Sequence, residues 1–330
     1  MSLYRKILAQ AWKITWRYKY LWFFGLFAAL LGNGGEYEML ARGFNGETDG
    51  AVLPAWQQLA DTGVFQARTI NNIGSIMKDD PFALIMLTAI GLVILLLLCF
   101  LVWLAVVSQA ALVNNASVYA GDKKSDFKSG LASGIKNFWP VLGLNAASKL
   151  IIYLAFLSVG LPIAAAAARS ANVSVNLLYI AAFIILVAVA LAVSFIIKYA
   201  IAYTVIKGSN FMGAVRSGWQ LFVKNWLISI EMAFILFFIN FLVGLALVLI
   251  ILILAVPFLF AALMLYKLFY LTGFWAVAVL ALILFLAIII LGGAILATFQ
   301  ISSWTGLFME LVNKGGVAKI VRLVEEWKDK

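Results

Sequence analysis

The chain has 330 residues, of which 65% are hydrophobic and 12% are charged, whereas a soluble domain is about 45–50% apolar and about 25% charged. The absence of histidine and the single cysteine, Cys99, exclude histidine-based catalysis, histidine metal sites, intramolecular disulfides and CxxC redox pairs. Several apolar runs exceed the roughly 20 residues that cross a bilayer. We therefore expect an all-helical, polytopic transmembrane bundle, with residues 1–330 as one integral membrane domain. No catalytic site, metal or cofactor is expected.

The predicted crossings follow from the apolar runs in chain order. The first run, 20–31, has the length of a thin crossing when it is extended back to Trp16. A cleaved signal peptide is the alternative, but no small-residue cleavage pattern follows the run, which favours a retained helix. Further crossings are predicted over 82–113, 142–168 and 177–206. The stretch 226–300 is long enough for two long crossings or three short ones.

The distribution of Lys and Arg favours a total of six crossings. With a cytoplasmic N-terminus, six crossings leave most basic residues inside, as the positive-inside rule requires, and a seventh would move the basic C-terminus outside. The sequence thus predicts three hairpins with both termini in the cytoplasm, and a last turn within 257–273. The inner segments would hold 17 of the 24 basic residues: Arg5, Lys6, Lys13, Arg17, Lys19, Lys123, Lys124, Lys128, Lys136, Lys207, Arg216, Lys224, Lys314, Lys319, Arg322, Lys328 and Lys330.

A short basic segment precedes three of the crossings, and its apolar residues recur at the spacing of an amphipathic helix. This pattern predicts three repeated units, each an interfacial helix followed by a transmembrane hairpin, with the first helix within 1–19. Residues 301–330 are expected to form a cytoplasmic amphipathic tail. The stripes are Leu3/Ile7/Ala11/Ile14, Phe127/Leu131/Ile135/Phe138 and Phe211/Val215/Trp219/Phe222, with N-caps predicted at Ser125 or Asp126 and at Ser209 or Asn210.

Tryptophans cluster near the predicted inner boundary, where the headgroup layer favours indole rings beside Lys and Arg. Topology and anchoring alone account for this pattern, and recruitment of anionic lipid headgroups at the cytoplasmic face is the functional hypothesis. A membrane-protein partner is a second expectation, and no nucleic acid is expected. The predicted interfacial anchors are Trp12, Trp16, Trp139, Trp219, Trp226 and Trp327.

The long segment 33–80 is predicted to be an extracytoplasmic loop, with seven acidic residues against three basic ones. An acidic, solvated loop that follows the charge bias of translocation is the preferred interpretation. Binding of cations or of a basic partner is the functional alternative, because loops of this length are often functional.

Three charges lie inside predicted crossings, namely Lys149, Lys198 and Glu231. Such charges are costly and are functional candidates unless they lie near a helix end. Counting 1.5 Å per residue puts Lys198 and Glu231 at similar depths, about 10–13 Å from the inner ends of their helices, which suggests an ion pair. Together with Asn145 and Asn240, these three charged residues would form a polar seam between the helices. The preferred interpretation is structural, by pairing or snorkelling, and the alternative is a cavity for an anionic headgroup or for proton movement.

The segments Trp12–Arg17 and Gly218–Trp226 resemble the aromatic, basic helices of uncharacterised bacterial six-helix membrane proteins. These proteins are similar to the membrane domain of some glycerophosphodiester phosphodiesterases. The resemblance implies a multi-pass protein of the bacterial cytoplasmic membrane with inward-facing interfacial helices. The phosphodiesterase barrel of the bifunctional relatives is missing here, so the resemblance supplies no catalytic residue.

These observations favour a non-enzymatic membrane protein that acts as an embedded scaffold, a lipid-interacting module or an accessory subunit. The alternative is a small transporter or flippase-like permease that uses the seam of Lys149, Lys198 and Glu231. A membrane enzyme using Asp79 and Asp80 is a third hypothesis, but this acidic pair is more typical of the border of a crossing.

Overall fold

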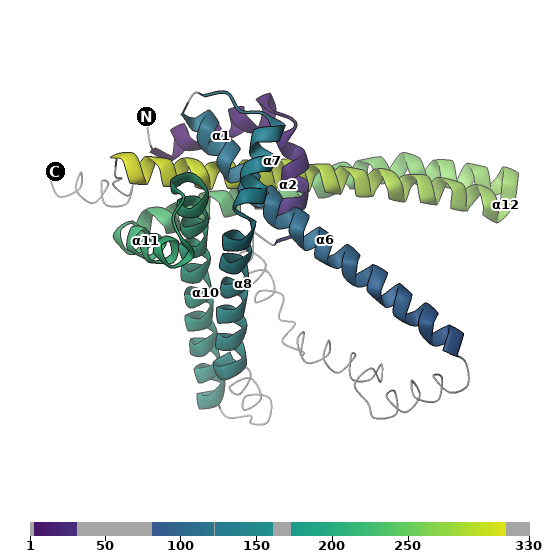
Figure 1. The fold of residues 1–330 in the computed structure, drawn as a ribbon. Helices are drawn as coiled ribbons and strands as arrows, with labels where there is room; N and C mark the ends of the chain where they lie inside the picture. The colour runs from purple at the N-terminus through teal and green to yellow at the C-terminus, as the bar shows by residue number, and fades with distance from the viewer. Residues whose placement is uncertain (1–2, 32–80, 122, 161–172, 315–330) are drawn as a thin grey trace. The chain divides into compact units, whose positions relative to one another are not determined.

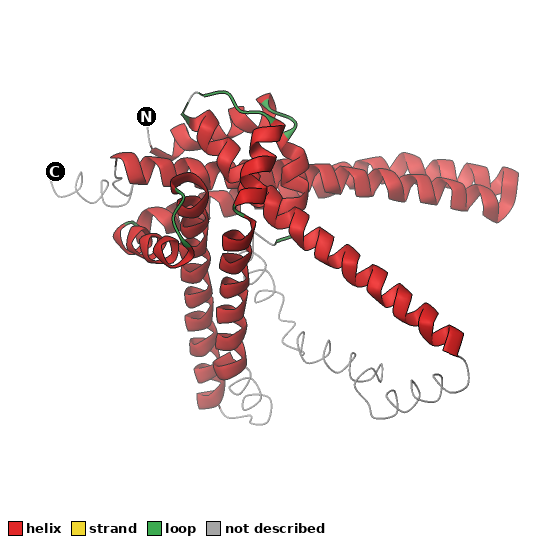
Figure 2. Ribbon diagram, viewed as in Figure 1, coloured by secondary structure: helices red, strands yellow, loops and turns green. Residues whose placement is uncertain are grey.

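The computed structural model describes residues 3–31, 81–121, 123–160 and 173–314. Every regular element within these ranges is a helix, which confirms the all-helical prediction (Figure 2). Contacts divide the chain into two units, one made of residues 1–33 and 104–330 and the other of residues 34–103. The second unit contributes only the first part of one helix to the described residues, so the contacts below belong to the first unit.

Four of the described helices are long and apolar enough to cross a membrane, as expected of a membrane-embedded protein. They are α6, α8 together with the π-helical turn that continues it, α10 and α12. The elements in chain order are α1 (Leu3–Arg17), α2 (Leu21–Ala29), α6 (Pro81–Ala120), α7 (Phe127–Lys136), α8 (Phe138–Ala155) with the π-helical turn Phe156–Gly160, α10 (Val173–Lys207), α11 (Phe211–Lys224) and α12 (Trp226–Lys314) (Figure 1).

The predicted first crossing differs from the others in the structure. The helical segment breaks between Arg17 and Leu21, and α2 has nine residues, or about 14 Å of helix. This length is about half of the hydrocarbon thickness of a bilayer. The predicted loop 33–80 lies outside the described residues. The described part of the chain contains four helices that could span a membrane, whereas the charge distribution predicted six crossings.

The longest element, α12, consists of two antiparallel halves that lie side by side (Figure 1). The backbone leaves helical geometry at Phe269 and Tyr270, within the range predicted for the last turn, and Tyr270 has a positive φ of 53°. The halves are in contact where Phe258 meets Phe285, with ring centroids 5.8 Å apart. Each half has roughly 40 residues and is about 60 Å long, twice the thickness of the bilayer core.

The predicted interfacial segments form helices α1, α7 and α11. Asp126 is the N-cap of α7 and accepts a 2.9 Å hydrogen bond from the Ser129 backbone N–H, in a reciprocal capping box. Asn210 lies at the N-cap of α11. Each of these residues was one of two N-cap candidates predicted for its helix. The capping box at Asp126 explains why α7 begins at Phe127.

Small residues of α7 and α11 face the long helices on which they pack. A Cβ on Gly134 of α7 would overlap the carbonyl of Val107 in α6, and a Cβ on Gly218 of α11 would overlap the carbonyl of Ile196 in α10. Close backbone approach at small residues is a common mode of helix packing in membranes. The predicted apolar stripes are only partly in contact with the protein. Phe127 stacks on Phe24 of α2 with ring centroids 4.7 Å apart, and Phe222 lies 5.8 Å from Phe195 of α10, whereas Ile135 and Trp219 are exposed.

Helix α1 packs on the C-terminal half of α12, and here the glycine is on the long helix. Ile7 of α1 lies against Gly306, and Ala11 and Ile14 of the same stripe are buried. Each interfacial helix thus packs on one long helix: α7 on the end of α6, α11 on the end of α10, and α1 on the end of α12.

The segment 301–330 was predicted as a cytoplasmic amphipathic tail, and only its first part is described. Helix α12 extends to Lys314, and Ile301, Trp304, Leu307 and Phe308 are buried within the first unit. This part of α12 packs against α1. Residues 315–330, including Trp327, lie outside the described residues.

Candidate functional site

The ends of α6, α10 and α12 surround a cavity of about 40 Å³. At roughly 10–15 Å³ per water, this space accommodates about three waters. The described lining contains one cation, Lys198, and no carboxylate. The lining residues are Gln109, Val113, Lys198, Tyr199, Ile201, Ala202, Gln300, Ile301, Trp304 and Thr305.

Each of the three long helices supplies at least one polar residue of the cavity wall. Gln109 lies two residues after Val107, and Lys198 lies two residues after Ile196, where Val107 and Ile196 are the packing points of Gly134 and Gly218. On α12, Gln300 lies six residues before Gly306, which is in contact with Ile7 of α1. Gln109 likewise lies six residues before Asn115, which Gly130 of α7 contacts.

The same registers relate three apolar lining residues. Val113 follows Gln109 by four residues, Ala202 follows Lys198 by four, and Trp304 follows Gln300 by four. One helical turn separates the members of each pair, so both lie on the same helix face. The cavity therefore lies among the ends of α6, α10 and α12, and each of these helices contributes a polar and an apolar position.

Lys198 lies over an aromatic surface at the cavity. Its ammonium nitrogen is 4.7 Å from the centroid of the Trp304 ring and 5.8 Å from that of Phe195. Trp304 is only 8% exposed. Cation–π contacts of a desolvated ammonium are worth about 2 kcal/mol. Trp304 thus contributes to holding the charge of Lys198 among apolar helices.

The two asparagines of the predicted seam lie one hydrogen bond behind the cavity wall. Asn145 of α8 donates a 2.7 Å hydrogen bond to the side-chain oxygen of Gln109. The side-chain nitrogen of Gln300 donates a 2.5 Å hydrogen bond to Asn240 in the other half of α12. These contacts join Asn145 and Asn240 to the same polar cluster as Lys198, although neither asparagine lines the cavity itself.

Glu231 lies beside this cluster and contacts the N-terminal helix. Its carboxylate accepts a hydrogen bond from the Tyr4 hydroxyl. The Tyr199 hydroxyl, on the cavity wall, lies 2.7 Å from that of Ser229, so the segments that carry Lys198 and Glu231 meet at one level. The Lys198–Glu231 ion pair stays a prediction. Lys149, the third predicted charge, is exposed on α8 and is not among the lining residues.

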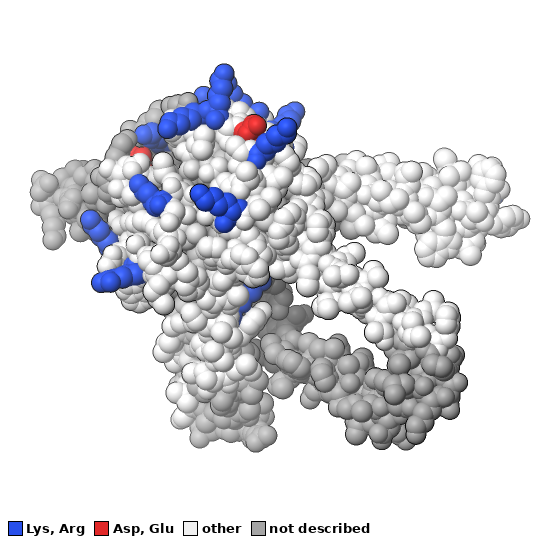
Figure 3. All heavy atoms as spheres, viewed as in Figure 1, with Lys and Arg blue, Asp and Glu red and all other residues white. Residues whose placement is uncertain are grey.

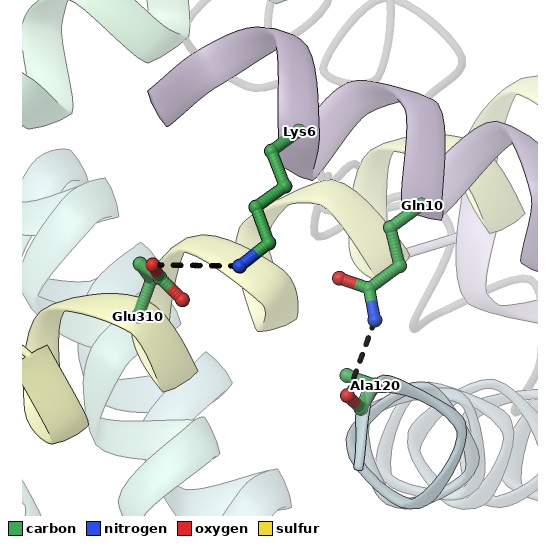
Figure 4. Close-up of polar contacts among 4 residues, drawn as sticks. All are labelled: Lys6, Gln10, Ala120 and Glu310. Carbon is green, nitrogen blue, oxygen red and sulfur yellow. Dashed lines mark hydrogen bonds and ion pairs between the residues drawn. The ribbon is translucent and has the colours of Figure 1, made fainter. Parts of the chain in front are cut away.

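Polar contacts hold α1 in place near the ends of the long helices (Figure 4). The Lys6 ammonium lies 3.9 Å from the Glu310 carboxylate, and the Gln10 side chain donates a 3.1 Å hydrogen bond to the Ala120 carbonyl. Burial of Tyr4, and secondly its contact with Glu231, raise the pKa of its hydroxyl well above the usual value. The hydroxyl is therefore a hydrogen-bond donor at neutral pH.

A basic, aromatic surface covers α1, α7, α11 and the adjoining turns. On the face that Figure 3 shows, most Lys and Arg gather over these helices, whereas the far part of α12 shows none. Trp12, Trp16, Trp139, Trp219 and Trp226 are all exposed, as the predicted anchors require. The basic residues of this surface with described side chains are exposed as well: Arg5, Lys6, Lys13, Arg17, Lys19, Lys123, Lys124, Lys128, Lys136, Lys207, Arg216 and Lys224.

Among the described residues, no group of three or more Cys, Asp or Glu side chains could hold a metal ion. Cys99 is exposed on α6. Sequence analysis missed Gln109, Gln300 and Tyr4, because a single amide or hydroxyl in an apolar helix has no signature. These residues could have been found only from their positions along the long helices relative to the points where the interfacial helices pack. No family model, curated protein or solved structure matches the chain.

Proposed function

We propose that the chain is a non-enzymatic, multi-pass protein of the bacterial cytoplasmic membrane, and that it binds anionic lipid headgroups through its interfacial helices. In this proposal it acts as a membrane-embedded scaffold or lipid-interacting module. Three hairpins cross the bilayer six times, and α1, α7 and α11 lie at the cytoplasmic surface. The resemblance to the membrane domain of glycerophosphodiester phosphodiesterases is compatible with this proposal.

The observation that carries the proposal is the orientation of the interfacial helices. Their small residues pack on the protein, and their Lys, Arg and Trp side chains are exposed together with large apolar residues such as Ile135 and Met212. An exposed ring of cations next to apolar side chains fits the headgroup layer, where the cations meet phosphates and the apolar groups enter the acyl boundary. Each basic residue near an anionic surface contributes about 1 kcal/mol.

The direct test compares the thermal stability of the purified full chain in detergent with added phosphatidylglycerol or phosphatidylcholine. We expect phosphatidylglycerol to raise Tm by several degrees and phosphatidylcholine to leave it nearly unchanged, because only the former carries net charge. A variant with Lys13, Arg17, Arg216 and Lys224 changed to Gln should lose most of this shift. The matched control changes Lys149 and Lys267, which are exposed elsewhere. Equal shifts with both lipids, or in both variants, contradict the proposal.

The topology has its own test, because Cys99 is the only cysteine. In a Cys99→Ala background, Tyr270→Cys places a thiol at the turn of α12, and Ser129→Cys places one on α7. Both parent side chains are exposed. A membrane-impermeant maleimide added to spheroplasts, which lack the outer membrane as a barrier, should label position 270 and leave position 129 unlabelled. The reverse pattern, or labelling of both positions, contradicts the topology.

A transporter is the second candidate, favoured by the cavity around Lys198. The described cavity is small for a permeation path, at about 40 Å³. Reconstitution of the full chain with fluorescent phosphatidylglycerol, followed by quenching of the outer leaflet, separates the two functions. We expect the inner-leaflet fluorescence to stay protected as in protein-free vesicles. Rapid loss of that protection would establish lipid translocation instead.

A further inference from the structure

We propose that the corner between α1 and α2, residues 12–23, is a discrete binding site for one anionic phospholipid. Lys13, Arg17 and Lys19 bind its phosphate group, indole rings contact its glycerol region, and the apolar surface of α2 receives its acyl chain. This inference rests on the proposed function and deepens it, because it assigns the tightest lipid contact to one part of the basic surface.

The chemistry of the chain changes from basic to apolar at this corner. Lys13 and Arg17 lie one helical turn apart near the end of α1, Lys19 lies in the turn that follows, and all three side chains are exposed. The nine residues of α2 are all apolar, and Phe23 among them is 45% exposed. Residues 3–29 contain neither Asp nor Glu. Cations followed by apolar side chains match the order of groups along an anionic phospholipid, from the headgroup to the acyl chain.

Three indole rings form a row at the same corner. The centre of the Trp16 ring lies 5.5 Å from those of Trp12 and Trp22, with interplanar angles of 57° and 87°. Phe299 of α12 supports Trp12 at 6.2 Å, and the Trp22 indole N–H donates a 2.9 Å hydrogen bond to the Thr15 carbonyl. Trp12 and Trp16 are nevertheless 57% and 43% exposed. Indoles favour the membrane interface, and rings already held in place lose little conformational freedom when a ligand binds.

The turn that carries Lys19 is attached to the end of α6. Tyr18 stacks on Tyr119 with ring centroids 3.7 Å apart, and the hydroxyls of Tyr20 and Tyr119 lie 2.7 Å apart. The Arg17 guanidinium lies 5.7 Å from the centre of the Tyr18 ring, a cation–π contact that orients it. The corner thus presents its cations from a backbone that is held by neighbouring helices, which lowers the cost of binding one lipid in a defined position.

The corresponding corners that follow α7 and α11 have fewer of these features. Each has one basic residue in the last helical turn and one tryptophan at the start of the next helix. At the position of Lys13 in α1, α7 has Ala132 and α11 has Gln220. Lys224 and Trp226 at the end of α11 are exposed, like their counterparts in α1. They therefore provide matched controls in which the single cation and indole are present without the row and the cluster.

The test is native mass spectrometry of the detergent-purified full chain during titration with phosphatidylglycerol, which separates the first bound lipid from later ones. In the wild type we expect the first lipid to bind at least about tenfold more tightly than the second. Lys13→Gln with Arg17→Gln should weaken this first step at least about tenfold, because two of its three cations are lost. Trp16→Ala should weaken it several-fold. Phosphatidylcholine, which has no net charge, should show no tight first step.

The matched variants are Arg216→Gln with Lys224→Gln, and Trp226→Ala, and both should keep the first step of the wild type. The changed side chains are exposed in all four variants, so each is expected to fold. Selective loss of the first lipid in the variants of the corner supports the site.

The outcomes also separate this site from the proposed function. Equal weakening by the two pairs of charge changes, or a wild type without a tight first step, means that lipid binds to the basic surface as a whole. This result overturns the discrete site and leaves the proposed function standing. A first step that phosphatidylcholine reproduces, or that the variants of the corner leave unchanged, overturns the site as well. Absence of any phosphatidylglycerol binding overturns the site together with the proposed function.

Discussion

The Lys198 ammonium lies 4.7 Å from the centre of the Trp304 ring, and this contact joins α10 to the last turns of α12. Both residues line the same cavity, and Trp304 is buried while Lys198 is half-buried. An ammonium over an indole face retains favourable electrostatic contact where water is scarce. The Lys198 ammonium is therefore in contact with the cavity wall and does not only extend toward the interface.

Loss of the indole should destabilise the fold beyond the loss of apolar packing. We expect Trp304→Leu to lower the free energy of unfolding by about 2 kcal/mol or more, because a large buried ring is replaced by a smaller side chain. A double-mutant cycle with Lys198→Met should give a coupling of about 0.5–2 kcal/mol from the cation–π contact. Equilibrium unfolding in mixed detergent measures it. Additive effects of the two changes would show that ring and ammonium do not interact.

Two glycines of α11 provide a matched pair for the packing of an interfacial helix. Gly218 faces the backbone of α10, whereas a Cβ on Gly213 meets no atom within 4 Å. Gly218→Ala should therefore cost about 1–3 kcal/mol of stability through overpacking. Gly213→Ala should be neutral or stabilise the protein by up to about 1 kcal/mol, because alanine is the better helix former. Unfolding midpoints of the two variants test this contrast, and equal effects would mean that α11 does not pack on α10 at Gly218.

The predicted Lys198–Glu231 ion pair has a specific test. The hydroxyl contact of Tyr199 with Ser229 brings the two segments to one level, and Glu231 already accepts a hydrogen bond from Tyr4. We expect Lys198→Met and Glu231→Gln to show a coupling of at least 0.5 kcal/mol in thermal or detergent unfolding, as is typical of charges in contact. The Tyr4→Phe variant serves as control, because it removes the hydroxyl contact and leaves both charges. Additivity of the two charge changes would reject the pair.

The N-cap of α7 predicts an acid-dependent contribution to stability. Hydrogen bonds from the backbone and side chain of Ser129 lower the pKa of the exposed Asp126 carboxyl. A carboxyl with a depressed folded-state pKa stabilises the protein above its unfolded-state pKa of about 4, and this contribution disappears as the pH falls through the lower folded-state value. The Tm difference between wild type and Asp126→Ala should be present at pH 6 and should shrink below pH 4. A difference that is constant over this range would exclude the carboxylate as the cap.

The sequence predicted the class of the fold because its signals are local. Apolar length gave the long helices, and the amphipathic spacing with a cap residue gave α7 and α11. The faces of these helices were not predictable, because the stripe of large residues dominates the pattern, while the closest backbone contacts are made by Gly134 and Gly218. Burial depends on which surface a neighbouring helix occupies, and one helix alone does not contain that information.

The candidate site was predicted only in part, for a similar reason. Lys198 and Glu231 were found because charges are rare in apolar runs, and Asn145 and Asn240 because they share the seam. Gln109 and Gln300 became visible only when the packing of the interfacial helices set the registers of α6, α10 and α12. The break before α2 agrees with the predicted boundary between the helix within 1–19 and the run 20–31, but the extension of the crossing back to Trp16 does not.

Native mass spectrometry of the full chain, extracted gently from its own membrane, tests the proposed function most directly. The account predicts that the protein retains anionic phospholipid, and that the variant with Lys13, Arg17, Arg216 and Lys224 changed to Gln retains much less. The control with Lys149 and Lys267 changed should keep the lipid of the wild type. A protein that emerges bare, or that carries zwitterionic lipid to the same extent in all three forms, would contradict it.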